Sequence, residues 1–179
     1  MFKKLSSLIY IYIYIYRRKS IESKLKKFKK AGGRIGEDCE VFPDVEFGSE
    51  PYLIDIGNHV RITNGVKFCT HDGGMWVLRN LDGKAIPDAD KFGKIKIGNN
   101  VHIGWNTIIM PNVTIGDNVV IGCGAIITHD IPSNSIAVGV PAKVIKTIDK
   151  YLDDNYGEIM HTKLMKPDEK KEFILRNLK

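Results

Sequence analysis

The chain contains five histidines, and one of them lies where a repetitive sequence pattern gives way to a long irregular segment. Histidine suits the removal of a proton from a substrate, because its pKa lies near neutrality. His71, which lies in the sequence FCTHD (residues 68–72), is therefore the first candidate for a general base. A loop histidine that only caps the end of a strand is the alternative. The other four histidines are His59, His102, His129 and His161.

The elements that must position His71 are predicted by a short internal repeat. An aliphatic residue occupies every sixth position from residue 97, and a second small or branched residue follows four positions after each. A period of six fits neither a helix nor a plain alternating strand, but it fits a short strand followed by a tight corner. Three such sides make a triangular coil of about 18 residues whose aliphatic positions stack into a ladder. The first set is Ile97, Ile103, Ile109, Ile115, Ile121 and Ile127, and the second is Val101, Thr107, Val113, Val119, Ala125 and Ile131.

An earlier block repeats this pattern less regularly. A slip of three residues divides it, which indicates a short excursion around residues 49–51. Between Thr70 and Lys94 the period disappears, and a loop of this length inside a compact repeat is usually functional or disordered. The aliphatic and aromatic positions of this block are Ile35, Val41, Phe47, Ile56, Ile62 and Phe68.

These patterns predict an all-β solenoid with appendages, in keeping with a length of 179 residues. The solenoid covers residues 32–146, with a loop excursion at about 71–94. A basic, amphipathic segment (1–31) precedes it and a helical extension (147–179) follows. In this extension we expect helices at 148–156 and from Pro167, a residue favoured at the first helical position.

The formal charge of +6 and a pI of about 9.1 suit an anionic partner. Nucleic acid is not favoured, because the basic residues concentrate before residue 31 without a recognised binding fold around them. The cysteines, Cys39, Cys69 and Cys123, are odd in number and lack the paired spacing of a metal site. We therefore expect reduced thiols in a cytoplasmic protein.

Two segments resemble the hexapeptide-repeat acyltransferases: residues 97–104 (IGNNVHIG) and 139–143 (GVPAK). The resemblance covers roughly residues 35–146 and is strongest to the galactoside, maltose and capsular-polysaccharide O-acetyltransferases. It implies a left-handed parallel β-helix and a homotrimer with active sites at the subunit interfaces. It also implies transfer of an acetyl group from acetyl-CoA to a hydroxyl of a sugar or oligosaccharide, in the synthesis of a cell-surface polysaccharide or glycolipid.

The same resemblance assigns the general base to His71, because the related catalytic histidine occupies this loop position. Glu50 and Asp72 are the carboxylates expected to orient the imidazole or to bind acceptor hydroxyls, although a loop-stabilising role is open for both. Asn64 either binds the acceptor or only forms hydrogen bonds at a corner of the coil. Trp76 stacks on the sugar or anchors the loop to a neighbouring subunit.

Residues 18 apart lie one coil above another, so Trp105 and Cys123 share a wall. In related enzymes the backbone at these positions lines the pantetheine groove. A small residue is common at the first of them, so Trp105 is a departure and can instead shape the acceptor pocket or pack at the trimer interface. Four other residues match family positions that contact CoA or lie near it: Thr128, His129, Lys143 and Lys146.

The N-terminal segment carries an apolar and tyrosine-rich run at residues 8–16. The run is shorter than the roughly 20 residues that span a bilayer, and basic residues follow it where a signal peptide would have a cleavage site. Ile21, Leu25 and Phe28 then recur at helical spacing among lysines. We expect either peripheral contact with the inner face of a membrane or an element that packs on the trimer.

Other functions remain open at this stage. The acceptor can be an amine, as on an amino sugar, or it can be serine or an antibiotic. A non-catalytic β-helix scaffold is a third hypothesis. We expect no metal, because β-helix carbonic anhydrases place two ligand histidines five residues apart and no pair here has that spacing.

Overall fold

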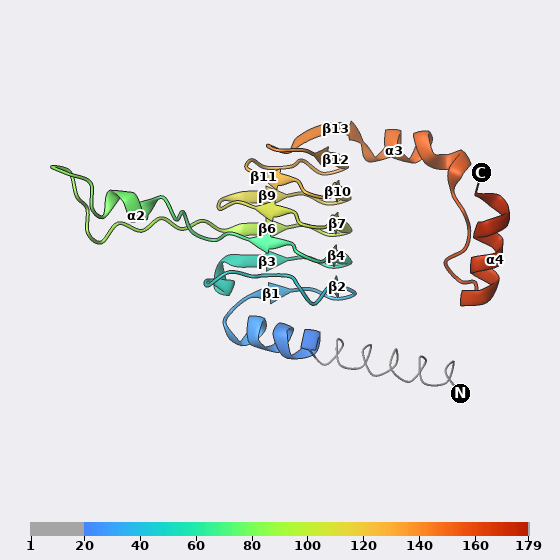
Figure 1. Ribbon diagram of the computed structural model, residues 1–179, viewed down its shortest axis with the longest axis horizontal. Helices are drawn as coiled ribbons and strands as arrows, with labels where there is room; N and C mark the ends of the chain where they lie inside the picture. The colour runs from blue at the N-terminus through green and yellow to red at the C-terminus, as the bar shows by residue number, and fades with distance from the viewer. Residues whose placement is uncertain (1–19, 179) are drawn as a thin grey trace. The chain divides into compact units, whose positions relative to one another are not determined.

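The computed structural model describes residues 20–178. Within them, short strands form three sheets whose members stack in parallel, as expected for a β-helix (Figure 1). Three successive coils contribute one strand to each sheet. The first sheet contains β1 (Arg34–Ile35), β3 (Ile54–Ile56), β6 (Ile95–Ile97) and β9 (Val113–Ile115).

The second sheet contains β2 (Glu40–Val41), β4 (Val60–Ile62), β7 (Val101–Ile103), β10 (Val119–Ile121), β12 (Ser135–Val138) and β13 (Lys143–Thr147). In it, β13 pairs antiparallel with β12. The third sheet contains β5 (Lys67–Phe68), β8 (Ile108–Ile109) and β11 (Ile126–Ile127). This third sheet carries most of the candidate site residues at its two ends.

The core is the predicted ladder of aliphatic side chains. Ile103 pairs with Ile62 in the coil before it and with Ile121 in the coil after it. All three are 0% exposed. Burial of a branched aliphatic side chain contributes roughly 1.5–3 kcal/mol, so this repeated stacking is the main stabilisation of the solenoid.

One corner of the later coils is built from asparagine. Asn100, Asn118 and Asn134 all have positive φ, a conformation that asparagine tolerates better than most residues. Their side chains form a ladder, in which the amide nitrogen of Asn100 donates to Asn118 over 2.8 Å and that of Asn118 donates to Asn134 over 2.9 Å. This ladder fixes the register from one coil to the next.

A helix over residues 20–30 packs on the first coil. Phe28 is 3% exposed and its ring centroid lies 4.2 Å from that of Phe47. Ile21 and Leu25 also pack against the core. The predicted apolar stripe is therefore used inside the protein, whereas the tyrosine-rich run at residues 8–16 lies outside the described residues.

The chain between β5 and β6 projects beyond the sheets and contains a short helix, α2 (Met75–Leu78) (Figure 1). A 3-10 turn, η1 (Pro51–Leu53), occupies the excursion predicted at residues 49–51. No helix in residues 20–178 is both long and apolar enough to cross a bilayer.

The chain divides into two compact units, with the boundary after Ile148. The second unit contains the remainder of α3 (Ile148–Asn155), η2 (Tyr156–Glu158) and α4 (Pro167–Asn177). Helix α4 begins at Pro167 with Asp168 and Glu169 in its first turn, so the helical tail is confirmed.

Candidate active site

His71 lies at the neck of the projecting loop, where the chain leaves the third sheet. The backbone N–H of Asp72 donates to the carbonyl of Lys91 over 2.9 Å, and that of Gly93 donates to the carbonyl of Thr70 over the same distance. His71 itself pairs antiparallel with Phe92. The candidate base is thus held by a short two-stranded neck rather than by a free loop.

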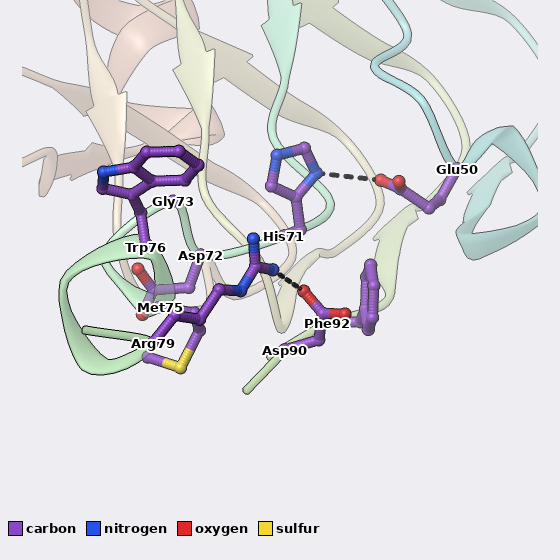
Figure 2. A pocket seen from close by; sticks show the side chains of 9 residues that line it. All are labelled: Glu50, His71, Asp72, Gly73, Met75, Trp76, Arg79, Asp90 and Phe92. Carbon is purple, nitrogen blue, oxygen red and sulfur yellow. Dashed lines mark hydrogen bonds and ion pairs between the residues drawn. The ribbon is translucent and has the colours of Figure 1, made fainter. Parts of the chain in front are cut away.

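Glu50 is brought to His71 by the excursion of the preceding coil. One carboxylate oxygen, Oε2, lies 3.0 Å from Nδ1 of His71 (Figure 2). The same oxygen accepts a hydrogen bond of 2.5 Å from Oγ1 of Thr70. The side chain of Glu50 is 14% exposed and that of His71 is 49% exposed. A largely buried carboxylate therefore supports an imidazole that remains open to the pocket.

The hydrogen bond from Thr70, followed by the one from His71, holds the pKa of Glu50 below its usual range. Glu50 is consequently ionised at neutral pH and can only accept hydrogen bonds. Nδ1 of His71 must then carry the proton, which leaves Nε2 with a free lone pair. Figure 2 shows this second nitrogen on the side of the ring away from Glu50, where a substrate hydroxyl could reach it.

The imidazole borders a pocket of about 270 Å³. Met75, Trp76 and Arg79, from α2 and the residue after it, line this pocket together with Phe92 (Figure 2). Trp76 is 75% exposed. Arg79 forms an ion pair with Asp90 and donates from Nε to the carbonyl of Ala89 over 2.9 Å. These contacts tie the two sides of the loop together and keep its helix beside His71.

Asp72 has a different set of partners. Its Oδ1 accepts a hydrogen bond of 2.9 Å from the backbone of Gly74, and its Oδ2 lies 3.3 Å from Nζ of Lys91. The Gly74 bond, followed by the Lys91 pair, lowers the pKa of Asp72. These are loop-stabilising contacts, so of the two predicted carboxylates Glu50 is the one bonded to the imidazole.

Three predicted site residues stack at the corner where the third sheet begins. The backbone N–H of Asn106 donates to the carbonyl of Asn64 over 3.0 Å, and that of Gly124 donates to the carbonyl of Trp105 over 2.7 Å. Asn64, Trp105 and Cys123 therefore lie one above another. Trp105 is 56% exposed, and Oδ1 of Asn64 is buried without a hydrogen-bond partner in the described residues.

The remaining predicted cofactor residues lie on later coils. Oγ1 of Thr128 and Nδ1 of His129 are 2.9 Å apart. Because β5, β8 and β11 are in register, these two residues lie two coils beyond Cys69 and Thr70, at the same end of the third sheet as His71. Lys143 and Lys146 lie on β13, the last strand of the second sheet.

The other histidines are not gathered around His71. His59 occupies a corner at positive φ, and its Nδ1 lies 2.7 Å from Oδ2 of Asp38. His102 faces outward on β7, where burial and then the nearby charge of Arg61 lower its pKa. His161 is exposed in the second unit. Among residues 20–178, no three His, Cys, Asp or Glu side chains are grouped as for a metal ion.

The candidate residues thus form two half-sites at opposite ends of the third sheet. Asn64 and Thr70 are six positions apart along the same coil, a separation of at most about 20 Å. One half-site carries the proton-accepting pair and the pocket, and the other carries the Asn64, Trp105 and Cys123 column.

Several residues of the site were missed by the sequence analysis. Thr70 is 1% exposed and directly precedes the candidate base, so its buried hydroxyl could have been suspected from the end of the periodic pattern. Arg79, Asp90 and Phe92 lie in an aperiodic segment. The ion pair of Arg79 with Asp90 and the backbone pairing of Phe92 with His71 are tertiary contacts, so no residue spacing in the sequence predicts them.

Comparison with known proteins gives related sequences and structures. A family described as bacterial transferase hexapeptide (six repeats) matches residues 94–129. Protein CapG of Staphylococcus aureus is 48% identical over 172 residues, covering 94% of this chain and 95% of that protein. Galactoside O-acetyltransferase of Escherichia coli (strain K12) is 33% identical over 150 residues, covering 72% of this chain and 70% of that protein.

Among solved structures, a galactoside acetyltransferase in complex with coenzyme A aligns with a TM-score of 0.56 and 30% sequence identity. The alignment covers 74% of each chain.

Proposed function

We propose that this chain, which belongs to the hexapeptide-repeat acetyltransferases, transfers an acetyl group from acetyl-CoA to a hydroxyl of a sugar. The observation that carries the proposal is the ionised Glu50 bonded to Nδ1 of His71, with Nε2 left open to a pocket. The acyltransferase class itself follows from the related acetyltransferases, so a non-catalytic scaffold is set aside.

In the proposed mechanism Nε2 of His71 removes the proton of the acceptor hydroxyl as its oxygen attacks the thioester carbonyl. The collapse of the tetrahedral intermediate breaks the bond from carbon to sulfur, and the imidazolium returns its proton to the departing thiolate. Glu50 stabilises the imidazolium that exists between these steps and fixes the tautomer beforehand. Similar carboxylate support of a histidine base is a recurring feature of acyl transfer.

Support for a sugar acceptor comes from the pocket and from the relatives. The exposed Trp76 offers an aromatic face on which the apolar face of a sugar ring can stack. The E. coli relative is named for galactoside O-acetylation. We assign the product to a cell-surface polysaccharide or glycolipid, and the enzyme to the cytoplasm, where its three unpaired cysteines would remain reduced.

We further propose that the active enzyme is a homotrimer of left-handed coils, with acetyl-CoA bound between subunits. The two half-sites at opposite ends of the third sheet support this arrangement, because a second copy could place its Trp105 and Cys123 wall beside the His71 of its neighbour. The pantetheine would follow this wall, and Thr128, His129, Lys143 and Lys146 would contact the nucleotide end, where ammonium groups suit phosphate.

Shared sites can be tested by mixing two inactive chains. His71→Ala removes the base, and Cys123→Arg obstructs the proposed cofactor wall with a long charged side chain. After joint unfolding and refolding at equal amounts, about one quarter of the sites would combine an intact base with an intact wall. Recovery near one quarter of wild-type activity supports sites between subunits, and no recovery contradicts them.

The test of the function itself is thiol release from acetyl-CoA over a panel of mono- and oligosaccharides, amino sugars, nucleotide sugars, serine and aminoglycosides. Wild type and His71→Ala are compared in parallel. Turnover with a sugar, reduced about 10²–10⁴-fold in the variant, supports sugar O-acetylation with His71 as base. Turnover only with an amine, serine or an antibiotic would replace the sugar assignment with one of those acceptors.

A further inference from the structure

The helix over residues 20–30 has two faces with different roles. Its apolar side is covered, because Phe28 is 3% exposed against Phe47, and Ile21 and Leu25 also pack on the core. On the same side, Nζ of Lys24 donates to the carbonyl of Val45 over 2.9 Å. The helix is therefore clamped to the first coil and has no apolar stripe left for another partner.

Its outer face is strongly basic. Lys26, Lys27, Lys29 and Lys30 are all exposed. Within residues 17–30, eight residues are basic and one, Glu22, is acidic. Because the helix is packed on the first coil, its four exposed lysines are held together at that end of the solenoid. We call these four lysines the basic patch.

The sequence that precedes the basic patch favours an anionic lipid bilayer over nucleic acid as its binding partner. Residues 8–16 (LIYIYIYIY) are aliphatic or aromatic, and Arg17, Arg18 and Lys19 follow them directly. Nucleic acid would be bound through the charge and through stacking on the four tyrosines of the run, and its five aliphatic residues would add nothing to that binding. Stable attachment to a bilayer, by contrast, takes two signals, such as an apolar insertion beside a polybasic surface.

We propose that the basic patch docks on an anionic lipid bilayer, the partner that its charge and the apolar sequence of residues 8–16 together favour. The patch would lie against the headgroups and hold the first coil at the surface of the membrane. The proposal does not depend on the identity of the acceptor, but it would place the pocket beside lipid-linked sugars rather than free ones.

The experiment is sedimentation of the full chain with two kinds of vesicle, one of phosphatidylcholine alone and one with about 30 mol% phosphatidylglycerol. Wild type is compared with a variant in which Lys26, Lys27, Lys29 and Lys30 are replaced by Gln. The control variant carries the same change of charge at four other exposed lysines, Lys96, Lys163, Lys166 and Lys171.

We expect wild type and control to bind the anionic vesicles and to be released at high salt, which screens surface charge. Since each lysine near such a surface contributes about 1 kcal/mol, a factor of about five, we expect the variant with four lysines replaced to bind about 100-fold or more weakly. Its thermal unfolding and its thiol release in solution should match wild type, so a failure here is distinguishable from a failure of the proposed acetyl transfer.

If the patch variant binds anionic vesicles as tightly as wild type, the proposal is overturned. It is also overturned if wild type binds neutral and anionic vesicles equally well, because residues 1–19 would then be enough for membrane binding without the basic patch. Binding to RNA without binding to anionic vesicles would also overturn it and would identify nucleic acid as the partner of the patch.

Discussion

Replacement of Glu50 by glutamine is the most informative single change at the proposed site. The substitution keeps the size of the side chain and removes its negative charge. In the wild type, Oε2 of Glu50 accepts the bond from Nδ1 of His71 over 3.0 Å. A glutamine amide can instead donate to Nδ1, which would shift the ring proton to Nε2, where the free lone pair is needed.

The size of the effect follows from the exposure of the pair. A hydrogen bond to a charged group contributes about 1.5–3 kcal/mol. The imidazole is 49% exposed, so solvent screens its charge. The much larger interaction energies of a charged pair in a water-free interior therefore do not apply here. We therefore expect kcat to fall about 10- to 150-fold, since each 1.36 kcal/mol of barrier is a factor of about ten in rate.

The assay is initial-rate thiol release with saturating acetyl-CoA and varied acceptor. Glu46→Gln is the matched control, because it makes the same chemical change at a carboxylate that pairs with Lys67 over 2.6 Å instead of with His71. We expect the control to stay within about twofold of wild type, as for other exposed ion pairs.

The predicted loss lies in kcat, because the imidazolium forms only during reaction. A folded Glu50→Gln variant with wild-type kcat would refute the role of Glu50, and a loss confined to the acceptor KM would mean that Glu50 binds acceptor instead.

Other changes test separate parts of the structure. Thr70→Val removes the hydrogen bond that most lowers the pKa of Glu50, so the stability that the ionised carboxylate contributes should be lost at a higher pH than in wild type as pH falls. In wild type, this contribution is present above the ordinary glutamate pKa of 4.5 and is lost as pH falls below it. Urea unfolding as a function of pH, with Thr107→Val as a buried-hydroxyl control, would show no shift if the bond were unimportant. Trp76→Ala should raise the acceptor KM about 2- to 10-fold without changing acetyl-CoA affinity in calorimetry. Asn118→Ala should destabilise the protein by about 1–2 kcal/mol in urea, and Asn118→Gly by less, because alanine is strained at a φ of 55°.

Much of the solenoid was predictable because its energetics are local and repeated. Each six-residue side buries its own aliphatic residue, so Ile103, Ile109 and Ile115 reveal the coil without any knowledge of distant contacts. The slip of three residues before Ile56 and the end of the period at Thr70 likewise predicted where the chain would leave the coil. His71 could be singled out because it directly follows that end.

The partner of His71 could be narrowed but not chosen from the sequence. Glu50 and Asp72 were equivalent candidates, and the choice depends on how the excursion of one coil lies against the neck of the next. Residues 21 apart meet there instead of residues 18 apart, because the excursion adds three positions. Similarly, the stripe of Ile21, Leu25 and Phe28 fitted a membrane or a protein surface equally well, and only the packing of Phe28 on Phe47 distinguishes them.

The measurement that tests the central claim most directly is the chemical nature of the product formed from acetyl-CoA and the best sugar acceptor. The account predicts an acetyl ester that mild alkali removes, formed by wild type and strongly reduced in His71→Ala. An alkali-stable amide would contradict transfer to a hydroxyl, and an ester formed equally fast by His71→Ala would contradict His71 as the base.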